Sequence, residues 1–305
     1  MVGRKTDTKT CPMEKKLKKY IPPYLWNGIK LAKTMPAKVK FQQAPLEPAW
    51  LGQEQIKNLL GSFPEVKKYN YDEQSCRQRG NERALFLAKL FSGLPRGKTI
   101  LELGCADAMT SVALKENGFN PIALDIRDQR IDVAKNNDIL FVKSPAEKIA
   151  LHDNAVDAVF SYNAMEHFDN PQKVLTEINR ILKPGGYFYA DFDPLYYSPR
   201  GLHAYRKINI PYLQILFKID DLKKYADLHQ LNWNELPLVN GYTIKKFSSL
   251  WKQVDDKFEI KSYEETLDIS GLDLIKKYPS CFKKEGVSFK NFIISGIKIL
   301  LIKKL

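Results

Sequence analysis

The stretch from Thr99 to Asp125, TILELGCADAMTSVALKENGFNPIALD, constrains the fold of this chain more than any other. Its first apolar run, Thr99–Leu103, predicts a buried strand, and a second run, Pro121–Leu124, predicts another that ends at Asp125. A turn of small residues and a helical stretch separate them, and Gly118 follows the helix where a left-handed cap costs least. Strand, turn, helix and strand form one βαβ unit, which predicts a doubly wound parallel sheet.

The parts of this unit suit a nucleotide. Small residues in the turn let main-chain N–H groups approach a ligand, and the start of the helix adds partial positive charge there. A carboxylate at Asp125 can accept hydrogen bonds from both hydroxyls of a ribose. A plain strand-to-helix turn without a ligand is the alternative.

The turn is a poor match to a dinucleotide site. The fingerprint G-x-G-x-x-G would need glycine at Gly104, Ala106 and Met109, and only the first place has it. The run Glu102–Ala108, ELGCADA, instead resembles motif I of the class I S-adenosylmethionine-dependent methyltransferases, E/D-x-G-x-G-x-G. Ala106 and Ala108 stand where that family has glycine. Because a positive φ costs an alanine about 1–2 kcal/mol, we expect ordinary negative φ angles at both.

Two later motifs strengthen the resemblance. Glu166-His167 follows a predicted fourth strand, Ala155–Phe160, and Leu182-Lys183-Pro184-Gly185-Gly186 precedes a predicted fifth, Tyr187–Phe192. The motifs cover about a third of the chain. The resemblance implies an α/β, Rossmann-like seven-stranded sheet, mostly parallel, with helices on both faces and an antiparallel last strand at Phe292–Ile302. Further expected elements are helices at Ala84–Phe91, Arg130–Asn136 and Pro171–Leu182 and strands at Ile139–Val142 and Phe258–Ser262.

The same resemblance implies S-adenosylmethionine as cofactor and suggests which residues hold it. Glu102 and Gly104 would face its amino-acid end, Asp125 its ribose, and the main chain near Ala146 its adenine, because Pro145 replaces the acid that the family has there. The full expected set is Glu102, Gly104, Cys105, Ala106, Asp125, Ile126, Pro145, Ala146, Glu147, Ser161 and Asn163.

An aromatic-rich insert, residues 194–250, is expected to form a lid over the acceptor. Tyr197, Arg200 and His203 are the candidates for acceptor contact, although irregularly spaced aromatic residues also form small cores. His203 and His167 are the candidates for catalysis, with a structural histidine as the alternative at His167. No metal site is expected.

Asp193-Pro194-Leu195-Tyr196 is similar to the (N/D)-P-P-(Y/F) motif of DNA-adenine methyltransferases. That motif follows the fourth strand, whereas these residues follow the predicted fifth. A DNA base is therefore rejected as the acceptor, and no nucleic-acid partner is expected.

The net charge of +13 is concentrated near the N-terminus, where residues 1–40 hold eleven Lys and Arg against Asp7 and Glu14. We expect residues 1–69 to be a basic extension and linker, extended over 36–54 because of its prolines, and 70–305 to be the methyltransferase domain. Residues 13–40 either contact an anionic membrane surface or dock on their own domain with the lysines solvated.

The chain has no run of 18 apolar residues and no cleavable apolar leader, and its four cysteines are far apart in sequence. A cytoplasmic protein, peripheral at a membrane if residues 13–40 bind one, is expected. The predicted function is O-methylation of a small-molecule or glycan acceptor. The alternatives are a lipid or quinone methyltransferase at a membrane surface, and a non-catalytic relative that binds the nucleotide.

Overall fold

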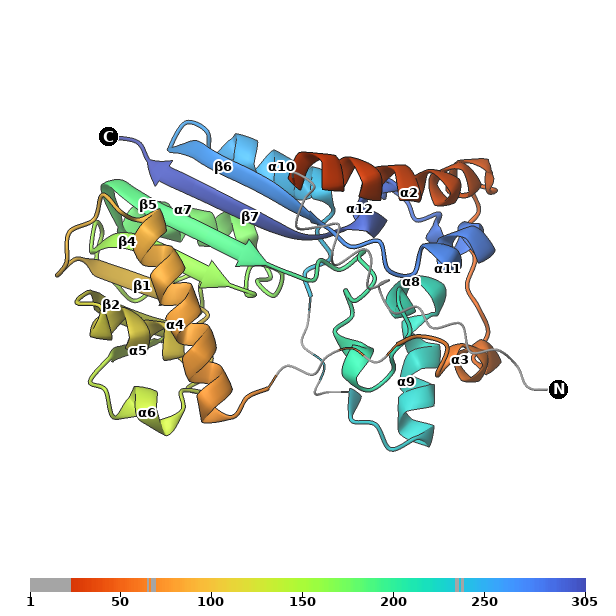
Figure 1. The fold of residues 1–305 in the computed structure, drawn as a ribbon, viewed down its shortest axis with the longest axis horizontal. Coiled ribbons are helices and arrows are strands. Elements are labelled where there is room, and N and C mark those ends of the chain that lie inside the picture. Colours follow the sequence, from red (N-terminus) through yellow and green to blue (C-terminus); the bar gives the residue numbers. More distant parts are fainter. Residues whose placement is uncertain (1–22, 65, 67–69, 234–235, 237–238) are drawn as a thin grey trace. The chain divides into compact units, whose positions relative to one another are not determined.

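The computed structural model describes residues 23–64, 66, 70–233, 236 and 239–305 (Figure 1), and the chain divides into two compact units. One unit combines Met1–Lys68, Tyr197–Pro237 and Leu267–Ser295; the other combines Tyr69–Tyr196, Leu238–Thr266 and Gly296–Leu305. This division differs from the expected one, in which 70–305 is a single domain. The reason is a shared core: residues of the N-terminal helices pack with residues of the insert and of 267–295.

The second unit, called the sheet unit below, is built on seven strands in the order β3-β2-β1-β4-β5-β7-β6. The first five strands are parallel, and β7 runs antiparallel beside β5, which confirms the predicted topology. Strands β1 and β4 are buried almost throughout and mainly apolar, as expected for a parallel sheet covered on both faces, with Glu102, Asp157 and Ser161 as buried polar exceptions. The bounds are β1 Thr99–Leu103, β2 Asn120–Asp125, β3 Leu140–Lys143, β4 Val156–Tyr162, β5 Leu182–Phe192, β6 Phe258–Leu267 and β7 Ile294–Lys303.

The helices of the sheet unit are α4 Glu73–Leu90, α5 Met109–Glu116, α6 Asp132–Lys135, α7 Pro171–Ile181 and α10 Ile244–Gln253. Helix α4 begins eleven residues before the predicted start at Ala84, because the Asp72 carboxylate accepts the Ser75 N–H (2.9 Å) and caps it there. Gly80 lets α4 approach α5 closely, since a Cβ at Gly80 would overlap the Met109 carbonyl.

The glycine pair before the fifth strand lies inside β5, which begins at Leu182 rather than at Tyr187 as predicted. The pairing of β4 with β5 shifts register between Val156 and Ala158, opposite this segment. A Cβ at Gly186 would lie 2.8 Å from the Lys183 carbonyl oxygen and 2.9 Å from that of Asp157, so only glycine fits there.

The first unit, called the helical unit below, contains α2 Pro23–Gln43, α3 Glu54–Leu59, α8 Leu213–Leu216, α9 Ile219–Leu228, α11 Leu272–Lys277 and α12 Lys290–Ile293, with 3₁₀ turns at Ala204–Arg206 and Pro279–Phe282. Its core includes Tyr212, whose ring meets those of Phe282 and Phe292 edge-on, at centroid distances of 5.0 and 6.4 Å. The Tyr212 hydroxyl donates to the Phe292 carbonyl (2.8 Å).

The prediction of a linker or extended arm over 36–54 is wrong for 36–43, because α2 continues through Pro36 to Gln43; residues 44–53 connect α2 to α3, which begins at Glu54. A proline inside a helix removes one hydrogen bond and crowds the preceding turn. Packing offsets that cost here: Ala37 is buried, and Phe41 contacts the rings of Phe289 and Phe292. Among the described helices, none has the length and apolar character needed to span a bilayer.

Candidate functional site

The turn after β1 is the centre of the candidate site. Its main chain has positive φ at Gly104 (76°), Ala106 (44°) and Ala108 (57°), so the prediction of ordinary angles at the two alanines is wrong. Hydrogen bonds hold this shape: the N–H groups of Gly104 and Cys105 both donate to the Leu124 carbonyl (2.9 and 3.0 Å), and Ala108 N–H donates to the Cys105 carbonyl (2.7 Å). The alanines therefore adopt the backbone that glycine would give the family motif.

Gly104 is also where the segment after β4 meets this turn. A Cβ at Gly104 would lie 2.7 Å from the Cβ of Ala164. The turn therefore lies at the end of β1 beside β4, where the strand order reverses: after β1 the chain continues to β2 on one side, and after β4 it continues to β5 on the other. Open α/β sheets bind their ligands at this position.

Asp125, at the end of β2, is hydrogen-bonded to the turn. Its Oδ2 accepts the Ala106 N–H (3.1 Å), and its Oδ1 accepts the Arg127 N–H (3.2 Å). Its carbonyl accepts the Ser144 N–H (3.2 Å), which joins the end of β3 to the same edge. Ile126, beside it, is exposed. The carboxylate is half-buried, with lone pairs left for further donors.

Glu102 lies inside the sheet unit and ties β1 to α5. Its Oε2 accepts hydrogen bonds from the Ser111 N–H (3.1 Å) and hydroxyl (2.6 Å). Burial raises the pKa of Glu102 to about 7, against the opposing effects of the Ser111 hydroxyl and the Arg83 charge. The Arg83 guanidinium lies 4.3 Å from the centre of the Tyr162 ring.

Asp107 completes the turn, and the sequence did not single it out. Its Oδ1 accepts the Met109 N–H (2.9 Å) at the start of α5, and its Oδ2 lies 3.6 Å from the Arg79 guanidinium of α4. Cys105, in the same turn, is buried, and burial raises the pKa of its thiol.

The expected adenine segment forms a turn beyond β3, in which the Lys148 N–H donates to the Pro145 carbonyl (3.1 Å). Ala146 is buried and Pro145 is exposed. The Glu147 carboxylate accepts the Asn170 N–H (3.3 Å), an interaction within the protein. The Ser144 hydroxyl is buried and has no hydrogen-bond partner among the described residues, so it is open to a ligand donor or acceptor.

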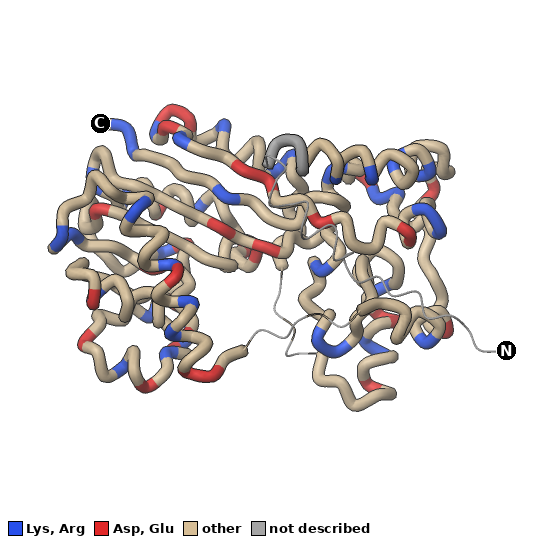
Figure 2. The backbone as a smooth tube through the Cα atoms, in the orientation of Figure 1, with Lys and Arg blue, Asp and Glu red and all other residues tan. Residues whose placement is uncertain are grey.

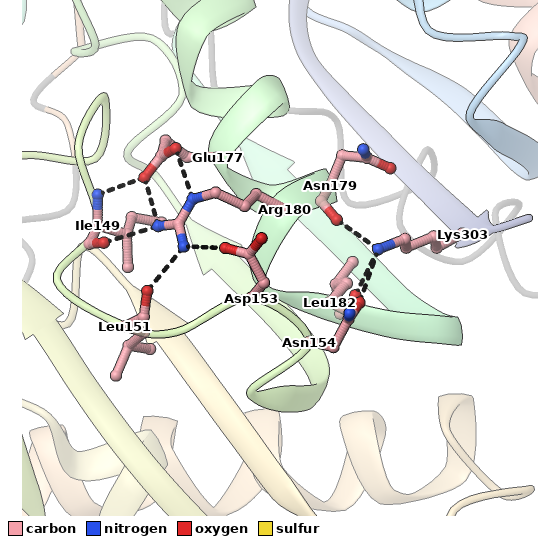
Figure 3. A network of polar contacts seen from close by, with 9 residues as sticks. All are labelled: Ile149, Leu151, Asp153, Asn154, Glu177, Asn179, Arg180, Leu182 and Lys303. Atoms are coloured by element: carbon pink, nitrogen blue, oxygen red, sulfur yellow. Dashed lines mark hydrogen bonds and ion pairs between the residues drawn. The ribbon is translucent and has the colours of Figure 1, made fainter.

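Arg180, on α7, holds the loop that follows this turn (Figure 3). Its guanidinium donates to the carbonyls of Ile149 (2.8 Å) and Leu151 (2.7 Å) and pairs with Glu177 and Asp153. Hydrogen bonding to Glu177 raises the pKa of Arg180 and lowers that of Glu177. Nearby, Lys303 donates to the carbonyls of Asn179 and Leu182 (both 2.7 Å) and to the Asn154 side chain (3.1 Å).

Two expected cofactor residues follow β4. The buried Ser161 hydroxyl donates to the Leu103 carbonyl (2.9 Å), which links β4 to β1. Asn163 has a φ of 50°, its N–H donates to the Asp191 carbonyl (2.9 Å), and the residue is exposed just after β4.

Glu166 was noted in the sequence only as part of a family motif and not as a site residue. Its side chain is 1% exposed, and neither carboxyl oxygen has a hydrogen-bond partner among the described residues. Burial raises the pKa of Glu166 well above its ordinary value, and the charges of Asp193 and Asp191 raise it further. His167 Nε2 lies 3.7 Å from Glu166 Oε1. An acid directly after a buried fourth strand was the available signal.

Asn240 holds the segment that carries Glu166. Its side-chain amide donates to the carbonyls of Met165 (2.8 Å) and Phe168 (3.1 Å), and its N–H donates to the Glu166 carbonyl (2.8 Å). The side chain of Glu166 is therefore presented by a fixed main chain.

The three expected acceptor residues lie in the helical unit. Tyr197 is half-buried beside Phe292 (centroids 6.5 Å apart), and Arg200 is exposed. His203 has a φ of 59°, and its Nδ1 lies 3.3 Å from the Gly201 carbonyl oxygen. The two candidate histidines thus come from different units.

Comparison with known proteins identifies the sheet unit. A family profile described as a methyltransferase domain matches residues 101–190. Ubiquinone biosynthesis O-methyltransferase of Dechloromonas aromatica is 26% identical over 183 residues, which are 50% of this chain and 75% of that protein. Malonyl-[acyl-carrier protein] O-methyltransferase of Marinomonas sp. is 30% identical over 132 residues, 40% of this chain and 48% of that protein. Sterol 24-C-methyltransferase of Pneumocystis carinii is 28% identical over 113 residues, 34% of this chain and 30% of that protein.

The chain spans three quarters of the first relative and less than half of the other two. The matched residues run from β1 to β5 and contain the turn at Gly104, Asp125 and Glu166. With its seven-stranded sheet and antiparallel β7, the chain belongs to the class I S-adenosylmethionine-dependent methyltransferases.

Proposed function

We propose that this enzyme methylates an oxygen atom of a small-molecule acceptor. The proposal rests on the turn Gly104–Ala108. Three of its five residues have positive φ, and its Ala106 N–H donates a hydrogen bond to the Asp125 carboxylate. S-adenosylmethionine supplies a methyl group already activated by a sulfonium. The protein therefore mainly has to align the acceptor and exclude water.

The residues at the carboxyl edge of the sheet fit this cofactor. The turn at Gly104 has no side chain at its closest point and would face the amino-acid end. Asp125 would accept hydrogen bonds from the ribose hydroxyls, and the buried main chain at Ala146 would lie along the adenine. The unsatisfied Ser144 hydroxyl supports a ligand on this side, because buried polar groups are normally hydrogen-bonded.

Glu166 and His167 are proposed to accept the proton of the acceptor. The bound cofactor would supply the methyl group and keep the electrons of its carbon–sulfur bond, so the acceptor hydroxyl would have to give up its proton to the protein. The hydroxyl proton then passes to Glu166 or His167. Because burial raises the pKa of Glu166 well above its ordinary value, Glu166 can accept this proton only in its ionised form, and when its carboxyl is neutral the proton goes to His167.

The choice of oxygen rests on the relatives. The proteins from Dechloromonas aromatica and Marinomonas sp. are named O-methyltransferases, whereas the one from Pneumocystis carinii is named a C-methyltransferase. An assay with matched phenol, aniline and thiophenol probes and S-adenosylmethionine, read by mass spectrometry of the methylated products, tests the atom. Methylation of the phenol is expected, and methylation of the aniline or thiophenol alone would overturn the choice of oxygen.

The proton acceptor is tested with Glu166→Gln, which keeps the shape of the side chain and removes the base. A loss of about 10²–10⁴-fold in kcat is expected, with little change in cofactor affinity. Asp169→Asn, an exposed acid three residues away, is the matched control and should leave kcat unchanged. An unchanged kcat in Glu166→Gln, with His167→Gln equally active, would refute this role for both residues.

A further inference from the structure

Helix α2 has two different faces. On one face, Thr34 and Ala37 are buried in the helical unit, and Phe41 packs against Phe289 and Phe292. This face docks α2 on its own unit; residues 13–22 of the basic segment lie outside the described part of the chain.

The opposite face of α2 is apolar and exposed. Leu31, Met35 and Val39 are 47%, 51% and 41% exposed. They are four residues apart and form one row along the helix. Ile29, 40% exposed, lies on the far side of the exposed Ala32 and Pro36, so the apolar stripe is wider than one row. Exposed helix faces of globular proteins are normally polar, so this face lacks the usual side chains.

Lysines border the apolar face on both sides. At 100° per residue, Lys38 lies beside Leu31 at one edge, while Lys33 and Lys40 lie beside Ile29 at the other. All three lysines are exposed. Residues 15–46 contain eight lysines and no Asp or Glu, and Figure 2 shows lysines but no acidic position along α2.

The net charge of the protein belongs to the same unit. The sequence segments of the helical unit hold 25 Lys and Arg against 12 Asp and Glu, which is +13. Those of the sheet unit hold 23 of each and are neutral. The sheet unit therefore contributes no net charge, and the whole excess of positive charge lies in the unit that contains α2.

We propose that the exposed face of α2 docks on an anionic lipid bilayer, with the helix lying in the plane of the interface. An apolar stripe bordered by lysines is the pattern of such helices: the stripe enters the headgroup boundary, and the lysines meet anionic headgroups. A second copy of this chain is the weaker occupant, because an α2–α2 contact would bring lysines against lysines without acids to pair them. The inference is independent of the acceptor proposed above.

The test is flotation of the full chain with vesicles of phosphatidylcholine alone or with 30% phosphatidylserine. Binding is expected only to the anionic vesicles, and 0.5 M NaCl should release most of it, since salt screens exposed charges. A triple variant, Leu31→Gln, Met35→Gln and Val39→Gln, removes the apolar row. Its control, Leu85→Gln, Leu140→Gln and Leu228→Gln, changes three leucines elsewhere that are more exposed than the α2 residues.

The α2 triple variant should lose at least about tenfold in binding and the control triple variant should lose none. Lys38→Gln with Lys40→Gln should also weaken binding by at least about tenfold, because each lysine near an anionic surface contributes about 1 kcal/mol. Circular dichroism and calorimetric titration with S-adenosylmethionine establish that each variant is folded and keeps the cofactor site. Equal vesicle binding by wild type and the α2 triple variant would overturn the proposal. So would a dimer of the wild type in light scattering that the α2 triple variant converts to a monomer.

Discussion

The main-chain N–H of Ala106 donates to the Asp125 carboxylate across 3.1 Å, so the turn after β1 and the acid after β2 form one structural unit. The acid expected to bind the ribose also stabilises the loop expected to bind the amino-acid end. The two halves of the proposed cofactor site are thus coupled, and a change at either should be felt at the other.

The two left-handed alanines should tolerate glycine. Ala106→Gly and Ala108→Gly relieve an unfavourable φ, a gain of about 1–2 kcal/mol that the greater unfolded-state freedom of glycine partly cancels. We expect both variants to be between unchanged and about 1 kcal/mol more stable by urea unfolding. Ala113→Gly, inside α5, is the control and should lose about 1 kcal/mol or more. A comparable loss in all three would contradict the positive φ angles.

Gly104→Ala should destabilise the protein by about 2–3 kcal/mol, through its positive φ and the contact with Ala164. The double variant with Ala164→Gly removes the contact and leaves the φ cost. Urea unfolding of the double variant should therefore show part of the lost stability restored. Full recovery would mean that the contact alone causes the loss, and no recovery would mean that the φ angle alone causes it.

Stability without cofactor should fall as pH rises from about 4.5 to 7. The pKa of Glu102 is about 7 in the fold and ordinary when unfolded, so between these values folding takes up a proton. The part of the loss that comes from Glu102, about 3 kcal/mol, should be complete just above pH 7. Glu102→Gln should show a shallower slope than wild type in urea unfolding at several pH values, because only Glu166 then contributes to it; the same slope in both proteins would exclude Glu102 as a contributor.

Arg180→Met should cost about 2–3 kcal/mol, because it removes the donors to the carbonyls of Ile149 and Leu151 and the pairing with Glu177 (Figure 3). Arg127→Met, at an exposed arginine of the same unit, is the control and should be nearly neutral. Amide hydrogen exchange should rise in residues 148–154 of the Arg180 variant only. Equal exchange in both variants would mean that Arg180 does not hold this loop.

Local pattern was enough to predict the strands of the sheet, because runs such as Thr99–Leu103 are buried on both faces and read as continuous apolar stretches. It failed at Ala106 and Ala108, where tertiary hydrogen bonds to Leu124 and Asp125 set the backbone against local preference. It failed again at Pro36, where packing of Ala37 and Phe41 outweighs the proline.

The acid at Glu166 shows a different limit. Its residue type and position after β4 could be seen in the sequence, but its complete burial and unpaired oxygens depend on contacts between distant segments. The grouping of 23–64 with 197–237 and 267–295 is likewise a matter of long-range packing, which periodicity along the chain does not encode.

The most direct test of the cofactor site is calorimetric titration of S-adenosylmethionine into wild type, Asp125→Ala and Asp128→Ala. Asp128 is an exposed acid three residues further on that pairs with Arg130, and its variant should bind like wild type. Asp125→Ala should weaken binding by on the order of 10²-fold, because charge-assisted hydrogen bonds are lost and the Ala106 turn loses its acceptor. Wild-type affinity in Asp125→Ala would contradict the assignment of the ribose site.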